Sequence, residues 1–154
     1  MSEILQGVEA LQDATRVLAG VALRSLEVLD GAVSLPQFRV LAVLADLRQA
    51  RSARVASALG LEASTVTRLV DRLVASGHVS REVDPSNRSA VTLDLTTRGQ
   101  RLVADVAAWR KRELTRILHG LEPAERAMLT GALRMLVQAA GDGYGALPHN
   151  PVPL

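Results

Sequence analysis

Apolar residues recur every three or four positions along most of the chain, and this spacing is typical of the buried face of an α-helix. The pattern predicts helices over residues 2–30, 34–50, 52–60, 62–76, 97–119 and 122–140. Cap-forming side chains precede several of these segments, and glycines follow several of them. The expected caps are Ser34, Ser52 and Thr96 or Thr97, and the expected terminators are Gly31, Gly60, Gly77 and Gly120.

The predicted buried faces consist mostly of aliphatic side chains. In the second helix the inward residues are expected to be Phe38, Leu41, Leu44, Ala45 and Leu47. In the last helix they are expected to be Leu129, Leu133, Leu136, Val137 and Ala140. The first helix carries an apolar stripe from Ile4 to Ala22 with little of its own domain to cover it, so a partner chain is the expected cover.

Between residues 79 and 95 the apolar period falls from about 3.6 to about 2, which is the period of a β-strand. Val79 and Val83 alternate with polar residues, as do Val91, Leu93 and Leu95. Residues 84–89 between these runs are rich in turn formers, so a hairpin with a polar tip is predicted. The expected fold class is mainly α with one small β-hairpin.

Residues 52–71 have the pattern of a helix-turn-helix. Ala56 is small enough for a second helix to cross closely, Gly60 suits a left-handed turn, and Val66 is placed to pack beneath that turn. The other apolar positions of the motif are Val55, Leu59, Leu61 and Leu69. Seven agreeing positions make the pattern far more specific than an isolated Ala-x-x-x-Gly.

The second helix of this motif carries a polar face opposite its apolar one. Ser64, Arg68 and Asp71 lie at its centre. An ordinary solvated helix has a similar surface, but short hydroxyl side chains near the start of such a helix favour contact with base edges in the major groove. The predicted DNA-binding residues of the motif are Ser52, Ser64, Thr65, Thr67, Arg68 and Arg72.

The hairpin after this helix completes the pattern of a winged helix. Its tip contains Asn87, Arg88 and Ser89, and Arg88 has no evident role in folding. Since the negative potential of a minor groove favours arginine, these three residues are predicted to contact DNA. Building the turn itself is expected to be the main task of Asn87 and Asp84.

The charge distribution also points to a polyanionic partner. The net charge is only +2, but residues 39–101 hold ten arginines and six acidic residues, a balance of +4. The remaining residues hold eight basic and ten acidic residues, a balance of −2. Arginine makes up 17 of the 18 basic residues, which a GC-rich coding sequence would also produce. Its concentration around the helix-turn-helix is typical of a nucleic-acid-binding centre.

Composition argues against several other classes of protein. The lack of cysteine excludes disulfides, thiolate metal sites and thiol switches, and 2% aromatic content is unsuited to base stacking. His78, His119 and His149 are not spaced as metal ligands and are expected to be surface or capping residues. No catalytic constellation, cofactor motif, export signal or long apolar run is visible. We therefore expect a soluble, cytoplasmic protein that is not an enzyme and has no cofactor or metal.

From about Leu5 to Ala140 the sequence resembles the multiple antibiotic resistance regulator (MarR) family of transcription factors. The resemblance rests on residues 64–73, on Gly77, on residues 84–90 and on Leu95-Thr96. It implies a homodimer joined through the terminal helices, with two winged-helix lobes on a palindromic operator. It also implies repression that is relieved by a small aromatic or phenolic ligand bound between lobe and dimer region.

The residues that we expect near such a ligand are Arg16, Phe38 and Trp109, although Phe38 suits an ordinary core position better. Two features depart from the family pattern. Asn87 and Ser89 stand where relatives carry an acidic residue and a second arginine, and Glu62 stands where relatives have a capping serine.

The expected organisation is a single MarR-like domain. It comprises an N-terminal dimerisation helix (1–33), a DNA-binding lobe (34–96), C-terminal dimerisation helices (97–140) and a loose tail (141–154). Two other interpretations are open: a winged-helix module that binds a protein instead of DNA, and a DNA-binding regulator without a ligand. The first would need acidic or apolar residues in place of Arg68 and Arg72.

Overall fold

The computed structural model describes residues 2–84 and 87–141, and at residues 84 and 88–90 it describes the backbone alone. The elements in chain order are α1 (Ser2–Ser25), the 3₁₀-helix η1 (Leu26–Leu29), α2 (Leu35–Leu47), α3 (Ser52–Leu59), α4 (Ala63–Ala75), β1 (Val79–Asp84), β2 (Asn87–Leu95), α5 (Thr97–His119) and α6 (Pro123–Ala140). The prediction of a mainly helical chain with one small β-hairpin is confirmed. No helix among the described residues is long and apolar enough to cross a membrane.

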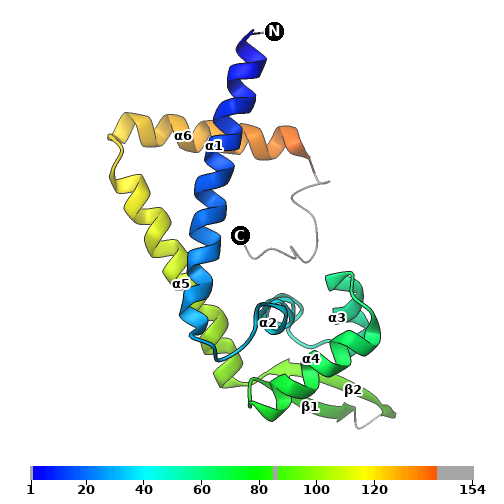
Figure 1. Cartoon of the computed structure of the whole chain (residues 1–154). Coiled ribbons are helices and arrows are strands. Elements are labelled where there is room, and N and C mark those ends of the chain that lie inside the picture. Colours follow the sequence, from blue (N-terminus) through cyan, green and yellow to red (C-terminus); the bar gives the residue numbers. More distant parts are fainter. Residues whose placement is uncertain (1, 85–86, 142–154) are drawn as a thin grey trace.

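The described part of the chain consists of a lobe and a set of long helices (Figure 1). The lobe contains α2, α3, α4 and the hairpin, and α5 leads away from it alongside the C-terminal part of α1. The N-terminal half of α1 extends beyond the lobe, and α6 turns away at the far end of α5 (Figure 1). The long helices therefore offer far more surface than they bury.

The core lies inside the lobe and is built from aliphatic side chains and one aromatic ring. Phe38, Leu41 and Leu44 of α2 are buried as predicted, and Leu47 is half-buried. Ala45 was expected to point inward but is exposed, because it lines a cavity that opens between α2 and α5. The buried residues that the other elements contribute include Val55, Leu59, Val66, Val70, Leu73, Val79, Leu93 and Val106.

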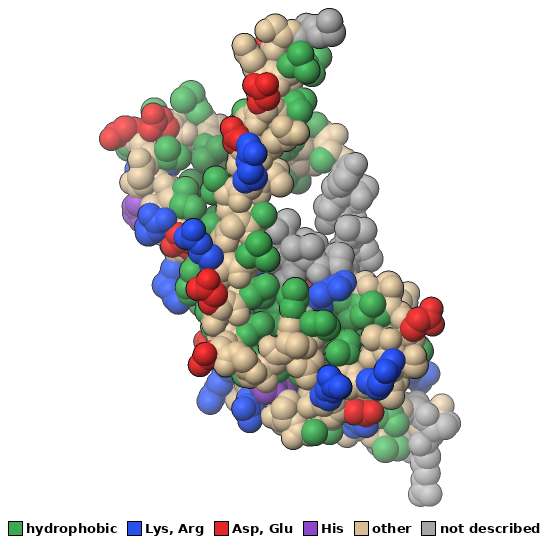
Figure 2. All heavy atoms as spheres, in the orientation of Figure 1, with side chains coloured by type: hydrophobic (Ala, Val, Ile, Leu, Met, Phe, Trp, Pro, Cys, Tyr) green, Lys and Arg blue, Asp and Glu red, His purple; other side chains and the backbone are tan. Residues whose placement is uncertain are grey.

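Two predicted apolar faces are not buried by the described chain. None of the residues of α6 is buried by the described chain, so the burial predicted for its apolar face depends on a partner and stays a prediction. The exposed apolar residues that we call the terminal apolar surface are Ile4, Val8, Leu11 and Leu18 of α1 and Leu129, Leu133, Leu136 and Val137 of α6. Hydrophobic side chains are visible along α1 in Figure 2.

Several helix ends follow the sequence signals. Ser34 and Gln37 form a reciprocal capping box, with Ser34 N donating to Gln37 Oε1 at 2.7 Å. Thr96 caps α5 by accepting from Gly99 N at 3.2 Å. Gly60 and Gly77 adopt φ values of +63° and +75°, the left-handed conformation predicted for them.

Three predicted boundaries are wrong. The regular α1 helix ends at Ser25 and continues as η1, so the first helical segment is not one uniform helix to residue 30. Helix α2 ends at Leu47 rather than near Ala50, because Arg48 takes a left-handed φ of +64° and breaks the helical path. Ser52 does not cap α3: Arg51 is the N-cap residue, and Ser52 is the first residue of the helix.

The hairpin is antiparallel and pairs Val79 with Leu95 and Arg81 with Leu93. Ala50 adds a third backbone segment to it, which sequence periodicity did not reveal. Ala50 N donates to Leu93 O at 3.2 Å, and Leu93 N donates to Ala50 O at 2.8 Å. These two bonds connect the segment between α2 and α3 to the inner strand of the hairpin.

His78 lies where α4, β1 and α5 meet, and its side chain is only 2% exposed. The side chain is therefore not at the surface, but His78 does cap a helix end as predicted, since its backbone N–H donates to Leu73 O of α4 at 2.9 Å. Its Nδ1 lies 2.8 Å from Ser76 Oγ, and its backbone carbonyl accepts from Thr96 N at 3.1 Å. Burial, reinforced by the positive charge of Arg98, lowers the pKa of His78 below its usual value.

Candidate nucleic-acid interface

The turn between α3 and α4 fixes the angle at which α4 leaves the core. Gly60 caps α3 in the left-handed conformation, and Leu61 N donates to Ala56 O at 3.0 Å. Ala56 is 5% exposed, and Val66 is completely buried. The helix-turn-helix predicted over residues 52–71 is therefore present, with its small and apolar residues in the expected places.

One side of α4 is buried in the lobe, and the other side faces outward. Val66, Val70 and Leu73 are fully buried and hold the helix in place. The predicted contact residues Ser64, Thr67, Arg68 and Arg72 are exposed, and Thr65 is half-buried. The structure thus brings five of the six predicted residues of the motif onto one helix, with Ser52 half-buried at the start of α3.

The polar side chains of α4 differ in what they offer a ligand. Thr67 Oγ1 donates to Ala63 O at 3.0 Å, so its hydroxyl proton is engaged and its free lone pairs act as acceptors. Ser64 and Arg68 make no hydrogen bond or ion pair with another described residue, so their donors are available. This surface presents both donors and acceptors, as base edges in a major groove do.

The start of α4 carries an acidic residue. Glu62 is the N-cap, and its side chain makes no capping hydrogen bond. Its exposed carboxylate is attracted by the helix dipole but repels a phosphate that approaches the same end. Because Glu62 replaces the capping serine of the family pattern, the start of α4 has no side-chain cap.

An ion pair joins α4 to the hairpin. Arg81 Nη2 of β1 donates to Asp71 Oδ1 of α4 at 2.5 Å, and both side chains are partly exposed. The sequence placed Asp71 on the polar face of α4 but did not single out Arg81. The pair is separated by ten residues and depends on how the hairpin folds back, so no local pattern signals it.

Of the predicted wing residues, only Asn87 has a described side chain, and it is exposed. Arg88 and Ser89 belong to β2, and their side chains lie outside the described residues. Val83 and Val91 face each other near the tip and are 57% and 39% exposed. Basic side chains, with acidic ones among them, lie on the lobe in Figure 2.

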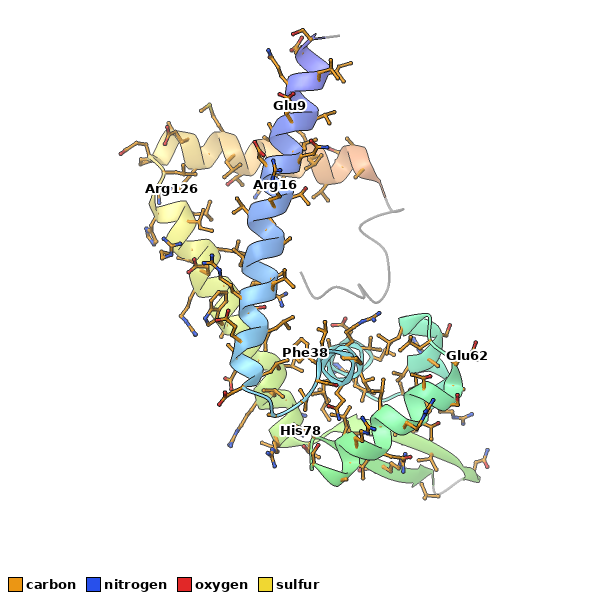
Figure 3. All side chains as sticks on the ribbon, viewed as in Figure 1. Glu9, Arg16, Phe38, Glu62, His78 and Arg126 are labelled. Atoms are coloured by element: carbon orange, nitrogen blue, oxygen red, sulfur yellow. The ribbon has the colours of Figure 1, made fainter. Side chains whose placement is uncertain are left out.

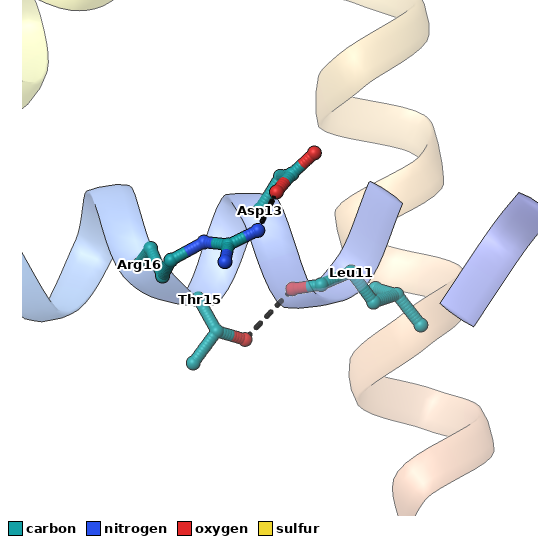
Figure 4. A network of polar contacts seen from close by, with 4 residues as sticks. All are labelled: Leu11, Asp13, Thr15 and Arg16. Atoms are coloured by element: carbon teal, nitrogen blue, oxygen red, sulfur yellow. Dashed lines mark hydrogen bonds and ion pairs between the residues drawn. The ribbon is translucent and has the colours of Figure 1, made fainter. Parts of the chain in front are cut away.

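The three residues predicted near a ligand are not brought together. Arg16 lies on the part of α1 that extends beyond the lobe, while Phe38 lies inside the lobe and is 2% exposed (Figure 3). Arg16 is bonded to Asp13 one turn earlier, next to the hydrogen bond from Thr15 Oγ1 to Leu11 O (Figure 4). Trp109 is half-buried on α5. Phe38 is thus a core residue, the alternative that the sequence favoured.

A cavity of about 490 Å³ lies between α2, β2 and α5. Its apolar lining includes Leu44 and Val103, and its polar lining includes Arg48, Asp94 and Gln100. The backbone of Arg48 holds a positive φ, which is uncommon for a residue with a side chain. None of the three residues predicted near a ligand lines this cavity.

Arg110 lies where α1 meets α5 and is half-buried. Arg110 Nη2 donates to Ser25 Oγ at 3.3 Å, and its buried Nε has no partner among the described residues. Burial lowers the pKa of Arg110. Among the described residues there is no group of three acidic, histidine or cysteine side chains able to hold a metal ion.

The sequence and the fold of this chain are similar to those of known proteins. The MarR family model matches residues 33–91, which span the end of the α1–α2 connection, the helix-turn-helix and most of the hairpin. The solved structure of RV1404 from Mycobacterium tuberculosis is 34% identical and superimposes with a TM-score of 0.78 over 87% of this chain and 92% of that one. The chain belongs to the MarR family.

Two further proteins are similar to this chain. YfiV of Bacillus subtilis, a helix-turn-helix type transcriptional regulator, is 29% identical over 107 residues, or 70% of this chain and 67% of YfiV. A Staphylococcus aureus MepR variant bound to an oligodeoxyribonucleotide shares the fold, with 21% identity, a TM-score of 0.71 and coverage of 86% of this chain and 96% of that one. The chain is therefore a MarR-family transcriptional regulator with a winged-helix fold, as its motifs suggested.

Proposed function

We propose that this chain is a dimeric, sequence-specific DNA-binding repressor that recognises a palindromic operator. The observation that carries the proposal is that α4 has one buried apolar face and one exposed polar face. Val66, Val70 and Leu73 anchor the helix, while Ser64 and Arg68 are exposed without partners among the described residues. A helix inserted into a major groove needs a fixed axis and free polar groups. The DNA-bound MepR variant, which shares the fold, supports this use of the lobe.

The terminal apolar surface supports the dimer. Large exposed apolar patches usually mark interfaces, and a groove of about 570 Å³ between α5 and α6 is lined by Leu118, Leu129, Leu133 and Val137. A second copy of this chain is the occupant that we propose. Its twofold symmetry would place two α4 helices about one helical turn (~34–36 Å) apart on the operator. Since such a regulator acts on the chromosome, we place it in the cytoplasm.

Ligand control is proposed for the cavity between α2, β2 and α5. Leu44 and Val103 provide an apolar lining, and the Arg48 guanidinium provides a cation. The Asp94 carboxylate also lines the cavity, but both of its oxygens accept hydrogen bonds, from Gln49 Nε2 at 3.4 Å and from Leu95 N at 2.7 Å. A small apolar or aromatic anion matches this combination. It would act by binding one spacing of lobe and long helices better than the spacing that fits the operator. Repression, rather than activation, follows the family resemblance.

The test is selection of genomic DNA fragments by the full-length protein, followed by release with a panel of small aromatic acids. Enrichment of fragments that share an inverted repeat is the expected result. Arg48→Met, which removes the cation but keeps the length of the side chain, should abolish release while leaving operator affinity unchanged. Failure to enrich any fragment would overturn the DNA-binding proposal, and enrichment without release by any anion would overturn the ligand proposal.

A further inference from the structure

We propose that Arg81 of β1 is a further DNA-binding residue, which contacts a phosphate between the major and minor grooves, and that Asp71 of α4 positions it. This inference rests on the proposed DNA-binding function. The observation behind it is the hydrogen-bonded ion pair between Arg81 Nη2 and Asp71 Oδ1 at 2.5 Å.

The pair is placed at the surface, between the two elements that would read DNA. Arg81 is on the same face of β1 as Val79, which is buried against the core. Arg81 lies two residues further toward the hairpin tip, where its side chain reaches α4 and keeps 38% exposure. The Asp71 side chain is 53% exposed. The guanidinium is thus held between helix and hairpin without being buried.

This position corresponds to the DNA backbone in a winged-helix complex. When α4 occupies a major groove and the hairpin tip reaches the adjacent minor groove, a sugar-phosphate strand runs between them. A cation between α4 and β1 faces that strand. The bond to Asp71 uses one N–H of a guanidinium that carries several more, and Arg81 makes no other bond to a described residue, so donors remain for a phosphate oxygen.

Asp71 pairs with Arg81 although two other arginines lie near it on α4. Arg68 lies one turn before Asp71 on the same helix face, and Arg72 is its direct neighbour, yet the carboxylate bonds to Arg81 across ten residues of sequence. Arg68 consequently has no ion pair among the described residues and remains available for base edges. An unpaired carboxylate here would repel the phosphates, whereas a paired one holds a cation toward them.

An exposed ion pair contributes little to folding stability, so stabilising the lobe is a weak reason for this contact. The ion pair instead favours DNA binding, by restricting the Arg81 side chain before the complex forms. Arginine loses side-chain freedom when it contacts a phosphate, and a guanidinium already held by Asp71 loses less on binding.

The experiment measures binding of the full-length protein to a selected operator and to a scrambled duplex by fluorescence anisotropy at several salt concentrations. The variants are Arg81→Ala, Arg81→Lys, Asp71→Asn and the double variant Asp71→Asn/Arg81→Ala. Arg112→Ala, an exposed arginine of α5 outside the lobe, is the matched control. Thermal melts of every variant verify that the fold is retained.

We expect Arg81→Ala to weaken operator binding roughly tenfold and to lower the magnitude of the salt slope by up to about 1.8 per dimer, since two phosphate contacts are lost. Arg81→Lys should keep the slope because it keeps the charge. Asp71→Asn should weaken operator binding more than scrambled binding, although it removes a negative charge. In the Arg81→Ala background the same change should have no further effect.

Two results would overturn the proposal. An unchanged salt slope in Arg81→Ala means that Arg81 does not meet a phosphate. Tighter operator binding in Asp71→Asn means that the carboxylate only repels DNA and positions nothing. If Arg81→Ala fails to fold, Arg81→Gln is compared with Arg81→Lys, because the two side chains have similar length but differ in charge. Equal salt slopes for these two variants would then overturn the proposal. Failure of the proposed function is distinguishable, because the parent protein would then bind neither duplex.

Discussion

Gly99 of α5 lies directly against the backbone carbonyl of His78, so that a Cβ atom on Gly99 would overlap the His78 oxygen. Thr96 strengthens the same junction, since its N–H donates to His78 O and its Oγ1 donates to Gly77 O at 2.6 Å. The first turn of α5 therefore joins the end of the lobe by direct backbone contact. Any larger residue at position 99 forces the two apart.

The Gly99→Ala variant is expected to be destabilised by about 1–3 kcal/mol, because the methyl group overpacks against backbone that has little freedom to move. Chemical denaturation monitored by circular dichroism measures the change. Gly20→Ala is the control, since no atom lies within 4 Å of a Cβ built at Gly20 of α1. Equal stability of Gly99→Ala and the parent would show that α5 is not held against the lobe by this contact.

Acid is expected to destabilise the protein through His78. Burial and Arg98 lower the pKa of His78 in the folded state below the usual value of 6.5. The unfolded chain therefore binds a proton at His78 more readily than the folded chain does. As the pH falls from 6.5 toward the folded-state pKa, this difference lowers the free energy of unfolding, whereas above pH 6.5 it has no effect. The free energy of unfolding, measured by urea titration between about pH 5 and pH 8, should fall over this window.

The His78→Gln variant should show a smaller fall in stability over the same pH window, because glutamine keeps a polar group but does not titrate. His119→Gln, at the exposed end of α5, should behave like the parent. An undiminished acid response in His78→Gln would assign the effect to other groups.

The Arg68→Ala variant should lose about 1–3 kcal/mol of binding free energy per half-site, since it removes an exposed side chain from the centre of the α4 surface. If Arg68 reads guanine, the preferred sequence at that position should also relax. Selection of operator variants by parent and variant protein measures both effects. Arg112→Ala serves again as control, and equal affinities for Arg68→Ala and the parent would remove α4 from the DNA-reading surface.

The Leu133→Glu variant should convert the protein to monomers, because it places a charge in the apolar groove between α5 and α6. Sedimentation equilibrium measures the mass. Leu35→Glu makes the same chemical change at a residue of the lobe that is 46% exposed, and it should leave the dimer intact. A dimeric Leu133→Glu protein would contradict the assignment of the terminal apolar surface to a second copy. Operator binding should fall together with the dimer, since one half-site alone supports little affinity.

Features that depend on neighbouring residues could be predicted from sequence. The Ser34–Gln37 capping box, the left-handed Gly60 and the alternating strands all arise from contacts or conformations within a few residues. The helix-turn-helix also lies within twenty residues, so its spacing is visible in one window. The same local character explains why the polar face of α4 was predicted as a set of DNA-binding residues.

Features that depend on folding over longer distances could not be predicted. His78 was expected to be a surface or capping residue because it stands at a helix end without a ligand spacing, and its burial depends on the approach of α5. The partnership of Asp71 with Arg81 requires the hairpin to fold back on α4. The exposed face of α6 shows the reverse case, since periodicity reveals which side is apolar but not whether the same chain covers it.

The bridge between Ala50 and Leu93 constrains how the lobe can move. Two backbone hydrogen bonds, at 3.2 Å and 2.8 Å, connect Ala50, in the segment between α2 and α3, to β2, the strand that precedes α5. Helix α2 packs against α4 as well as against β2, so rotation of α2 moves both the base of the hairpin and α4. A molecule bound between α2 and α5 would therefore displace α4 and the wing together, and so change the position of both DNA-binding elements at once.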